Sequence, residues 1–110
     1  MKEDATRREA LVVRLAGHHG DLFRVLHETA RSQTAVMTIP PGRDAGPEQT
    51  HDADQIVYVI EGEAEMRLGE ERCVAGPGTV ITIPAGTLHH VRSVGNVALF
   101  FLTVYAPPEY

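Results

Sequence analysis

The sequence predicts an all-β domain, a sandwich or a barrel, because short strand-like segments alternate with Gly- and Pro-rich turns along most of its length. Short strands at close, regular spacing are typical of these two architectures. With 110 residues, the chain is long enough for one hydrophobic core and too short for two. The predicted strands are residues 21–28, 34–39, 55–61, 63–68, 71–74, 80–83, 89–94 and 97–105.

A short helix is predicted ahead of these strands, over residues 4–15. The stretch is rich in Ala, Arg and Glu, its apolar positions include Leu11 and Leu15, and Gly17 follows as a stop signal. The expected division of the chain is a helix and leading strand in residues 1–33, the barrel in residues 34–106 and a C-terminal tail in residues 107–110.

Two predicted strands differ in how much of their surface must be covered. Within residues 64–68, apolar side chains alternate with Glu65 and Arg67, so one face of this strand is expected to be solvated. Residues 97–105 are apolar on both faces, which the wall of a small barrel cannot bury alone. We therefore expect a homodimer. The alternative is that the N-terminal segment of the same chain covers this strand.

Composition excludes several kinds of partner. The formal net charge is -5 and the basic residues are interleaved with acidic ones, so nucleic acid is not expected as a partner. No apolar run is long enough for a signal peptide or a membrane span, so no membrane partner is expected. The single cysteine, Cys73, cannot form an intrachain disulfide and is expected to be a small buried side chain. A cytoplasmic location follows.

Candidate metal ligands are concentrated in residues 49–55. Alternate residues of an extended strand share a face, so Gln49, His51 and Gln55 point to one side. The carboxylates of the segment point to the other side: Glu48, Asp52 and Asp54. If the strand carries a bulge, Glu48 replaces Gln49 as the ligand.

A fourth candidate, His89, follows the corner formed by Pro84-Ala-Gly86. The exit of this turn directs His89 toward the pocket, and strand alternation then sends His90 outward. Neutral imidazole is the commonest metal-ligating side chain. The predicted ligands of a divalent metal ion are Gln49, His51, Gln55 and His89. The alternative is a pocket in which these polar groups only hydrogen-bond one another.

The segment from Gln49 to Gly62 resembles the first motif of the cupin family. That motif has two histidines separated by one residue, then a glutamate, and a closing glycine. Gln49 and His51 stand at the two histidines, Gln55 stands at the glutamate, and Gly62 closes the motif. The spacing is kept, while two ligands change from imidazole or carboxylate to carboxamide.

The second cupin motif is matched more closely. It runs Gly, five residues, Pro-x-Gly, two residues, His, three residues, Asn. The matching residues are Gly78, Pro84, Gly86 and His89, with Ser93 replacing the asparagine.

The resemblance covers about residues 34–106 and implies a double-stranded β-helix, or jelly-roll barrel, with a short N-terminal helix. It favours a metal-dependent enzyme acting on a small organic substrate, with zinc, nickel, manganese or iron as the ion. Cupins include oxygenases, isomerases and lyases, so the fold does not select a reaction. Neutral ligands leave the charge of the ion uncompensated, which favours an anionic substrate. The alternative is a non-catalytic cupin that binds or senses a small molecule, with a structural metal or none.

Overall fold

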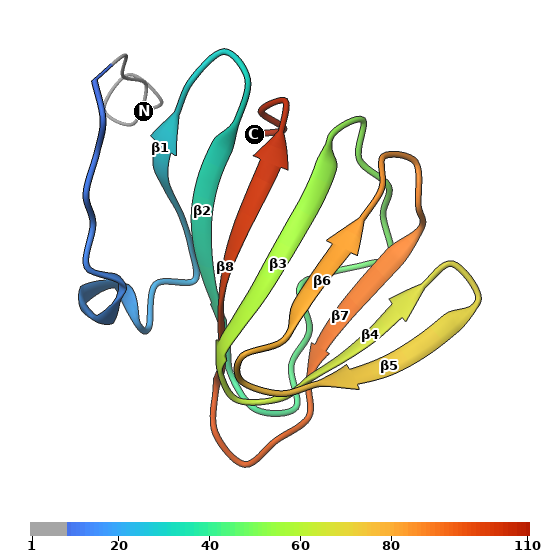
Figure 1. The fold of residues 1–110 in the computed structure, drawn as a ribbon. Coiled ribbons are helices and arrows are strands. Elements are labelled where there is room, and N and C mark those ends of the chain that lie inside the picture. Colours follow the sequence, from blue (N-terminus) through green and yellow to red (C-terminus); the bar gives the residue numbers. More distant parts are fainter. Residues whose placement is uncertain (1–8) are drawn as a thin grey trace.

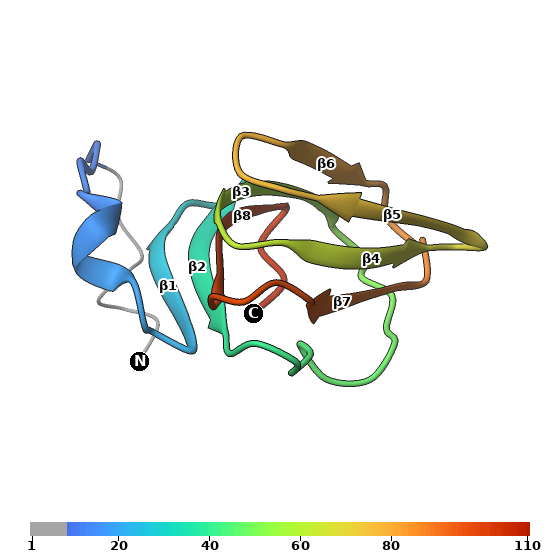
Figure 2. The same ribbon diagram turned by 90° about the horizontal axis from the view of Figure 1, so that it is seen from below.

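The computed structural model describes residues 9–110, which form two antiparallel β-sheets that face each other (Figure 1). The larger sheet has the order β1-β2-β8-β3-β6 and the smaller sheet has the order β5-β4-β7. Figure 2 shows the two sheets as opposed walls of a barrel. The predicted all-β jelly-roll fold is confirmed, and each predicted strand is present close to its predicted limits. The strands are β1 (Phe23–Glu28), β2 (Gln33–Ile39), β3 (Asp54–Glu61), β4 (Ala64–Leu68), β5 (Glu71–Ala75), β6 (Val80–Ile83), β7 (His89–Ser93) and β8 (Leu99–Ala106).

The register of the larger sheet places its inward side chains in rows. Val59 on β3 and Met37 on β2 both lie opposite Phe101 on β8. The smaller sheet supplies Met66 and Val91 to the same buried core. Each large apolar side chain removed from water contributes roughly 1.5–3 kcal/mol to folding, so this layer holds the two sheets together.

One inward row of the larger sheet is polar. Gln33 lies opposite Tyr105, and Tyr105 lies opposite Gln55 on its other side. All three residues are buried. This row lies beyond the apolar rows, toward one end of the barrel, and its members Gln55 and Tyr105 line the cavity of the candidate site.

The segment between β2 and β3 runs alongside β7 and lengthens the smaller sheet. The Ala45 amide donates to the carbonyl of Val91 at 3.0 Å. Gln49 and His89 exchange two backbone hydrogen bonds of 3.1 and 3.0 Å. This pairing carries the chain from the edge of the smaller sheet to the start of β3 in the larger one.

The predicted helix over residues 4–15 is wrong for the part that the structure describes. Residues 9–14 are not helical, and residues 4–8 lie outside the described residues. The 3-10 turn η2 (Leu15–His18) is the only helical element between residues 9 and 110. The adjacent β-branched residues Val12 and Val13 disfavour a helix, and Val12 is 94% exposed, so no apolar stripe is packed to stabilise one. No helix in the described residues is long and apolar enough to cross a membrane.

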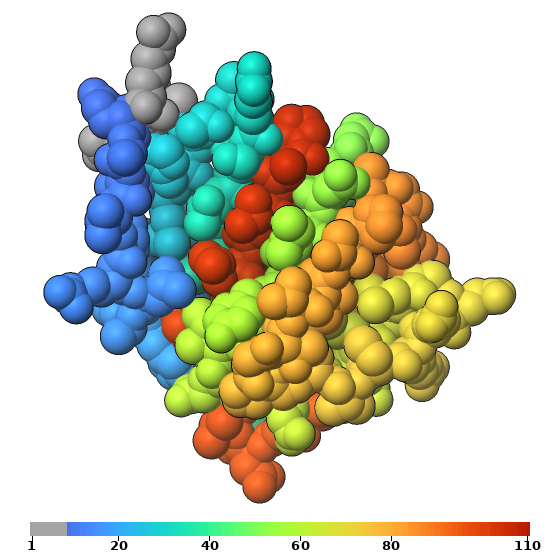
Figure 3. Space-filling view, viewed as in Figure 1, coloured from blue at the N-terminus to red at the C-terminus, as the bar shows by residue number. Residues whose placement is uncertain are grey.

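The outer face of β8 is covered at one end and open at the other. Phe100 is buried beneath the ring of His19, with ring centroids 5.0 Å apart, so the N-terminal segment of the same chain covers this end. Leu102 and Val104 are only half-buried. Figure 3 shows the side chains of β8 and β3 uncovered between β2 and β6. The homodimer stays a prediction, and its interface is expected on this open outer face.

Cys73 is exposed, so the expectation of a buried side chain is wrong. It lies on β5, the edge strand of the smaller sheet, where only the last residue, Ala75, is buried. Most of this strand projects past the space that the larger sheet covers (Figure 1).

Candidate metal centre

The segment that carries His51 is fixed against the corner that precedes β7. The Gly86 amide donates to the carbonyl of His51 at 2.8 Å, and the Ala85 amide donates to the Asp54 carboxylate at 2.9 Å. Gly86 has a φ of 82°, a left-handed conformation that glycine adopts without strain. The Pro84-Ala-Gly86 corner therefore positions His51 directly and His89 through the chain that follows.

The imidazoles of His51 and His89 face each other at the mouth of the barrel. Both side chains are buried, and their ring centroids are 5.0 Å apart. His51 leads into the larger sheet at β3, whereas His89 begins β7 of the smaller sheet, so each wall contributes one ring. His90 turns away, with its Nε2 atom 3.1 Å from the Asp44 carboxylate.

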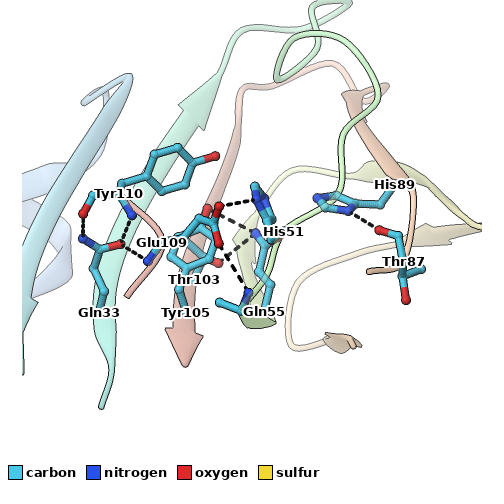
Figure 4. A network of polar contacts seen from close by, with 10 residues as sticks. Gln33, His51, Gln55, Thr87, His89, Thr103, Tyr105, Glu109 and Tyr110 are labelled. Atoms are coloured by element: carbon cyan, nitrogen blue, oxygen red, sulfur yellow. Dashed lines mark hydrogen bonds and ion pairs between the residues drawn. The ribbon is translucent and has the colours of Figure 1, made fainter. Parts of the chain in front are cut away.

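The Nδ1 atom of each imidazole has a polar partner (Figure 4). Nδ1 of His89 donates to the Thr87 carbonyl at 2.9 Å, and Nδ1 of His51 lies 3.3 Å from Oε2 of Glu109. A carbonyl oxygen accepts hydrogen bonds only, so Nδ1 of His89 carries the proton and its Nε2 keeps the lone pair, whereas His51 meets Glu109 in an ion-pair contact. This tautomer is the one that binds a metal ion through Nε2.

His89 is held in the neutral form. Burial lowers its pKa, and the nearby charge of His51 lowers it further, although the hydrogen bond to Thr87 acts in the opposite direction. A proton therefore competes less with a metal ion for this nitrogen than it does in free histidine.

Gln55 presents an oxygen atom that has no partner. Its amide nitrogen donates to the Thr103 hydroxyl at 3.0 Å and lies 3.4 Å from the Tyr105 hydroxyl (Figure 4). Its Oε1 atom is buried, and no hydrogen-bond donor among residues 9–110 reaches it. Such an unpartnered buried acceptor costs roughly 1–3 kcal/mol, which a cation or a water molecule at this position would recover.

Gln49 and its rival Glu48 lie in different places. Gln49 is exposed at the rim of the cavity, where its side chain hydrogen-bonds Tyr110. The Glu48 carboxylate lies 3.7 Å from Arg67, on the outer side of the smaller sheet. No bulge brings Glu48 into the site, so of these two side chains only Gln49 borders the cavity.

A cavity of about 210 Å³ opens beside these groups. Phe101 and Tyr105 line it, whereas Tyr58 and Phe100 lie on the outer face of the larger sheet. Burial raises the pKa of Tyr105, so its phenol keeps the proton and can donate a hydrogen bond. The remaining walls are mainly apolar, with Met37 and Val91 among them.

Two residues at the site are not among those that the sequence predicts. Glu109 contacts His51, and the Tyr110 ring lies with its centroid 5.8 Å from that of His51. Pro107 and Pro108 indicate only that the strand ends. The available signal is Gln33, the one polar residue on the inward face of β2, which holds this segment in place through hydrogen bonds to its backbone.

The donor set is unusual in its lack of carboxylates. Among the residues that the structure describes, no group of three or more His, Cys, Asp or Glu side chains is placed to hold one metal ion. The imidazoles of His51 and His89 would have to be complemented by the Gln55 amide oxygen. The free Nε2 atoms and the unpartnered Oε1 atom fit this arrangement.

Comparison with known proteins identifies the family. The model of the cupin domain matches residues 35–105, most of the chain. The chain belongs to the cupin family. Cupin proteins often bind a metal ion, and in this cupin the two motifs meet at His51 and His89.

Individual similarities agree with this assignment. The crystal structure of BH2720 from Bacillus halodurans matches with a TM-score of 0.86 and 29% identity, covering 94% of this chain and 85% of that chain. An RmlC-like cupin with a double-stranded β-helix fold from Methanocaldococcus jannaschii matches in fold with a TM-score of 0.71 and 20% identity, over 77% of this chain and 78% of that one. The protein YrkC of Bacillus subtilis is 29% identical over 84 residues, which are 71% of this cupin and 45% of YrkC. This chain therefore spans less than half the length of YrkC.

Proposed function

We propose that this cupin binds one divalent metal ion between His51 and His89 and uses it to bind and transform a small organic molecule. The ligands are the Nε2 atoms of the two imidazoles and Oε1 of Gln55, with Gln49 at the rim as the fourth. The unpartnered Oε1 atom of Gln55 carries the proposal, because it is a buried acceptor on a residue that lines the same cavity as His51 and His89.

The alternative of a self-satisfied polar pocket accounts for fewer of these atoms. In such a pocket the polar groups would pair with one another. Instead, His89 donates from Nδ1 to the Thr87 carbonyl, Gln55 donates through its amide nitrogen, and Nδ1 of His51 contacts the Glu109 carboxylate. Oε1 of Gln55 is left without a hydrogen-bond partner within the described residues, and Nε2 of His89 keeps a lone pair suited to a cation.

The ligand chemistry limits the choice of ion. Imidazole nitrogen suits zinc, nickel and iron, and amide oxygen suits manganese as well. Such an ion would supply Lewis-acid polarisation of a substrate oxygen or activation of a bound water. His51 and His89 would orient it, and the Tyr105 phenol would offer a hydrogen-bond donor at the cavity wall.

The size and charge of the site favour a small anion. The cavity of about 210 Å³ is below the roughly 300–1,000 Å³ of sites that hold drug-sized ligands. All proposed ligands are neutral, so the positive charge of the ion is left for the substrate to balance. Together with the protonated Tyr105, this arrangement favours a small carboxylate or a similar oxygen anion as the molecule bound.

A second candidate is a non-catalytic cupin that binds or senses a small molecule. One observation favours it: no Asp or Glu side chain among the described residues lines the cavity, so a carboxylate base is missing there. Tyr105 favours the enzyme, because burial raises the pKa of its phenol, which therefore keeps its proton and can donate a hydrogen bond to negative charge that develops on a substrate oxygen.

The experiment begins with chelator-treated protein. Zinc, nickel, manganese and ferrous iron are added separately, excess ion is removed, and metal per chain is measured by element analysis. We expect about one equivalent of at least one ion. The loaded protein is then incubated with a panel of small carboxylates and followed by NMR. New product resonances support the enzyme, whereas line broadening without product supports the binding module. Failure of all four ions to bind would contradict the proposed function.

A further inference from the structure

The residues that follow β8 fold back over the site and place a carboxylate beside His51 (Figure 4). Oε2 of Glu109 lies 3.3 Å from Nδ1 of His51. Oε1 of the same carboxylate accepts a hydrogen bond of 3.3 Å from the Ala53 amide. Both oxygens of Glu109 therefore contact the short segment that delivers His51 to the cavity.

The fold holds this segment through Gln33, whose side chain is fully buried. Oε1 of Gln33 accepts hydrogen bonds from the amides of Glu109 at 3.2 Å and Tyr110 at 2.9 Å. Its Nε2 atom donates to the Tyr110 carbonyl at 2.5 Å and to the Glu28 carboxylate at 2.8 Å. A buried amide satisfied on both its donor and its acceptor side fixes its partners firmly. The position of Glu109 is thus determined by the barrel and not by a loose surface contact.

We propose that Glu109 is the positioning residue of the metal site. Its carboxylate accepts the Nδ1 proton of His51, selects the tautomer with a free Nε2 lone pair, and orients that atom toward His89. The inference rests on the proposed function and assigns to it a carboxylate that lies outside both cupin motifs.

Glu109 acts through His51 and is not itself a ligand. The carboxylate contacts Nδ1, whereas the proposed ligand atom is Nε2 of the same ring. Glu109 also does not combine with His51 and His89 into a three-residue ligand group among the described residues. A carboxylate on the far nitrogen of a ligating histidine raises the basicity of the ring and holds its orientation.

The contact also compensates for the altered first motif. Gln55 stands where the cupin motif has glutamate, so the direct ligands bring no negative charge. Glu109 restores one negative charge at the distance of one imidazole ring. Outer carboxylates of this kind are worth roughly 10–100-fold in metal affinity.

The test compares Glu109→Ala and Glu109→Gln with Asp52→Asn. Asp52 is exposed next to His51, so its substitution removes the same charge nearby without touching the ring. Dissociation constants for Co²⁺ and Zn²⁺ are measured by chelator competition. We expect Glu109→Ala to weaken both by about 10–100-fold, Glu109→Gln to weaken them less, and Asp52→Asn to leave them within about twofold. The visible spectrum of the Co²⁺ protein should change for the Glu109 variants only.

A second measurement works without metal. Long-range ¹H–¹⁵N NMR on the chelator-treated protein reports which nitrogen of His51 carries the proton. Wild type and Asp52→Asn should hold it on Nδ1, and Glu109→Ala should show a shift toward Nε2. An unchanged tautomer in Glu109→Ala, or unchanged metal affinity in both Glu109 variants, overturns the role of Glu109. If wild type binds no metal, the proposed function fails, and the tautomer still decides whether Glu109 orients His51.

Discussion

His89 and His90 are consecutive residues of β7 whose side chains lie on opposite faces of the smaller sheet. His89 packs beside His51 in the barrel, and His90 pairs with Asp44 outside it. His89→Ala should therefore remove a ligand and strip or greatly weaken the metal, whereas His90→Ala should leave metal content nearly unchanged. Element analysis of the two purified variants makes the comparison. If His90→Ala loses the metal and His89→Ala retains it, the metal lies on the face of β7 that carries His90, and the assignment of His89 as a ligand is wrong.

The lowered pKa of His89 makes the stability of the metal-free protein depend on pH. In the unfolded chain the imidazole takes up a proton near its ordinary pKa of 6.5, whereas in the folded chain it does so only at lower pH. The unfolded state therefore binds more protons in this interval, and the free energy of unfolding falls as pH decreases below about 6.5.

The measurement is urea unfolding with chelator present, at about pH 7.5 and about pH 5.5, on either side of the ordinary histidine pKa. We expect a lower midpoint at the acidic pH for wild type and a smaller decrease for His89→Gln, which has no titrating ring. An equal decrease in both proteins would show that other groups cause the pH dependence.

The turn between β3 and β4 requires a glycine at position 62. Gly62 has a φ of 84°, and a Cβ atom there would lie 2.5 Å from the Ala98 carbonyl oxygen and 2.8 Å from the Leu99 Cα atom. Both neighbours are backbone atoms that cannot move aside. The glycine that closes the first cupin motif is thus needed for the close approach of the chain that leads into β8.

We expect Gly62→Ala to destabilise the fold by more than about 2 kcal/mol, because the clash adds to the cost of a left-handed conformation. Gly69→Ala is the control: its φ is 62°, and an added Cβ would meet no atom within 4 Å. It should cost only about 1–2 kcal/mol. Urea midpoints measure both variants, and a loss for Gly62→Ala no larger than for Gly69→Ala would contradict the steric explanation.

The strands could be predicted from the sequence because their signals are local. Alternation identified the inward faces of residues 64–68 and 89–94, and Gly and Pro marked the turns between the strands. The same alternation separated Gln49, His51 and Gln55 from the carboxylates of their segment. Gln49 pairs with His89 and borders the cavity, but it lies exposed at the rim, whereas His51 and Gln55 are buried.

The parts that could not be predicted depend on contacts between distant residues. The segment over residues 4–15 has helical composition, yet its described part finds no surface against which a helix could pack. Glu109 reaches His51 only because Gln33, remote in the sequence, binds the backbone next to it. Neither the missing packing surface nor the hydrogen bond between Gln33 and the Glu109 backbone can be recognised from a short window of neighbouring residues.

At the scale of the whole molecule, an apolar patch remains on the outer face of the larger sheet. Cross-strand pairs join its members, with Ile56 opposite Val104 and Tyr58 opposite both Leu102 and Val80. Ile56, Tyr58 and Val80 are each at least 40% exposed. Contiguous exposed apolar surface of this kind is typical of association sites, and we propose that it is the interface of a homodimer.

Light scattering on the protein eluting from a sizing column checks the dimer. Wild type should elute with twice the mass of one chain at micromolar concentration, and Tyr58→Glu should elute as a monomer because it places a charge within the patch. Val74→Glu changes a similarly exposed residue on β5 and should remain dimeric. A monomeric wild type would refute the interface, as would a dimeric Tyr58→Glu.

The central claim is that one metal ion lies between His51 and His89. Anomalous diffraction from crystals of the metal-loaded protein, recorded on both sides of the absorption edge of the ion, tests it directly. We expect one peak per chain, about 2.0–2.1 Å from Nε2 of both histidines and within coordination distance of Oε1 of Gln55. A loaded crystal with no peak between the two rings, or with a peak bound to only one of them, would contradict it.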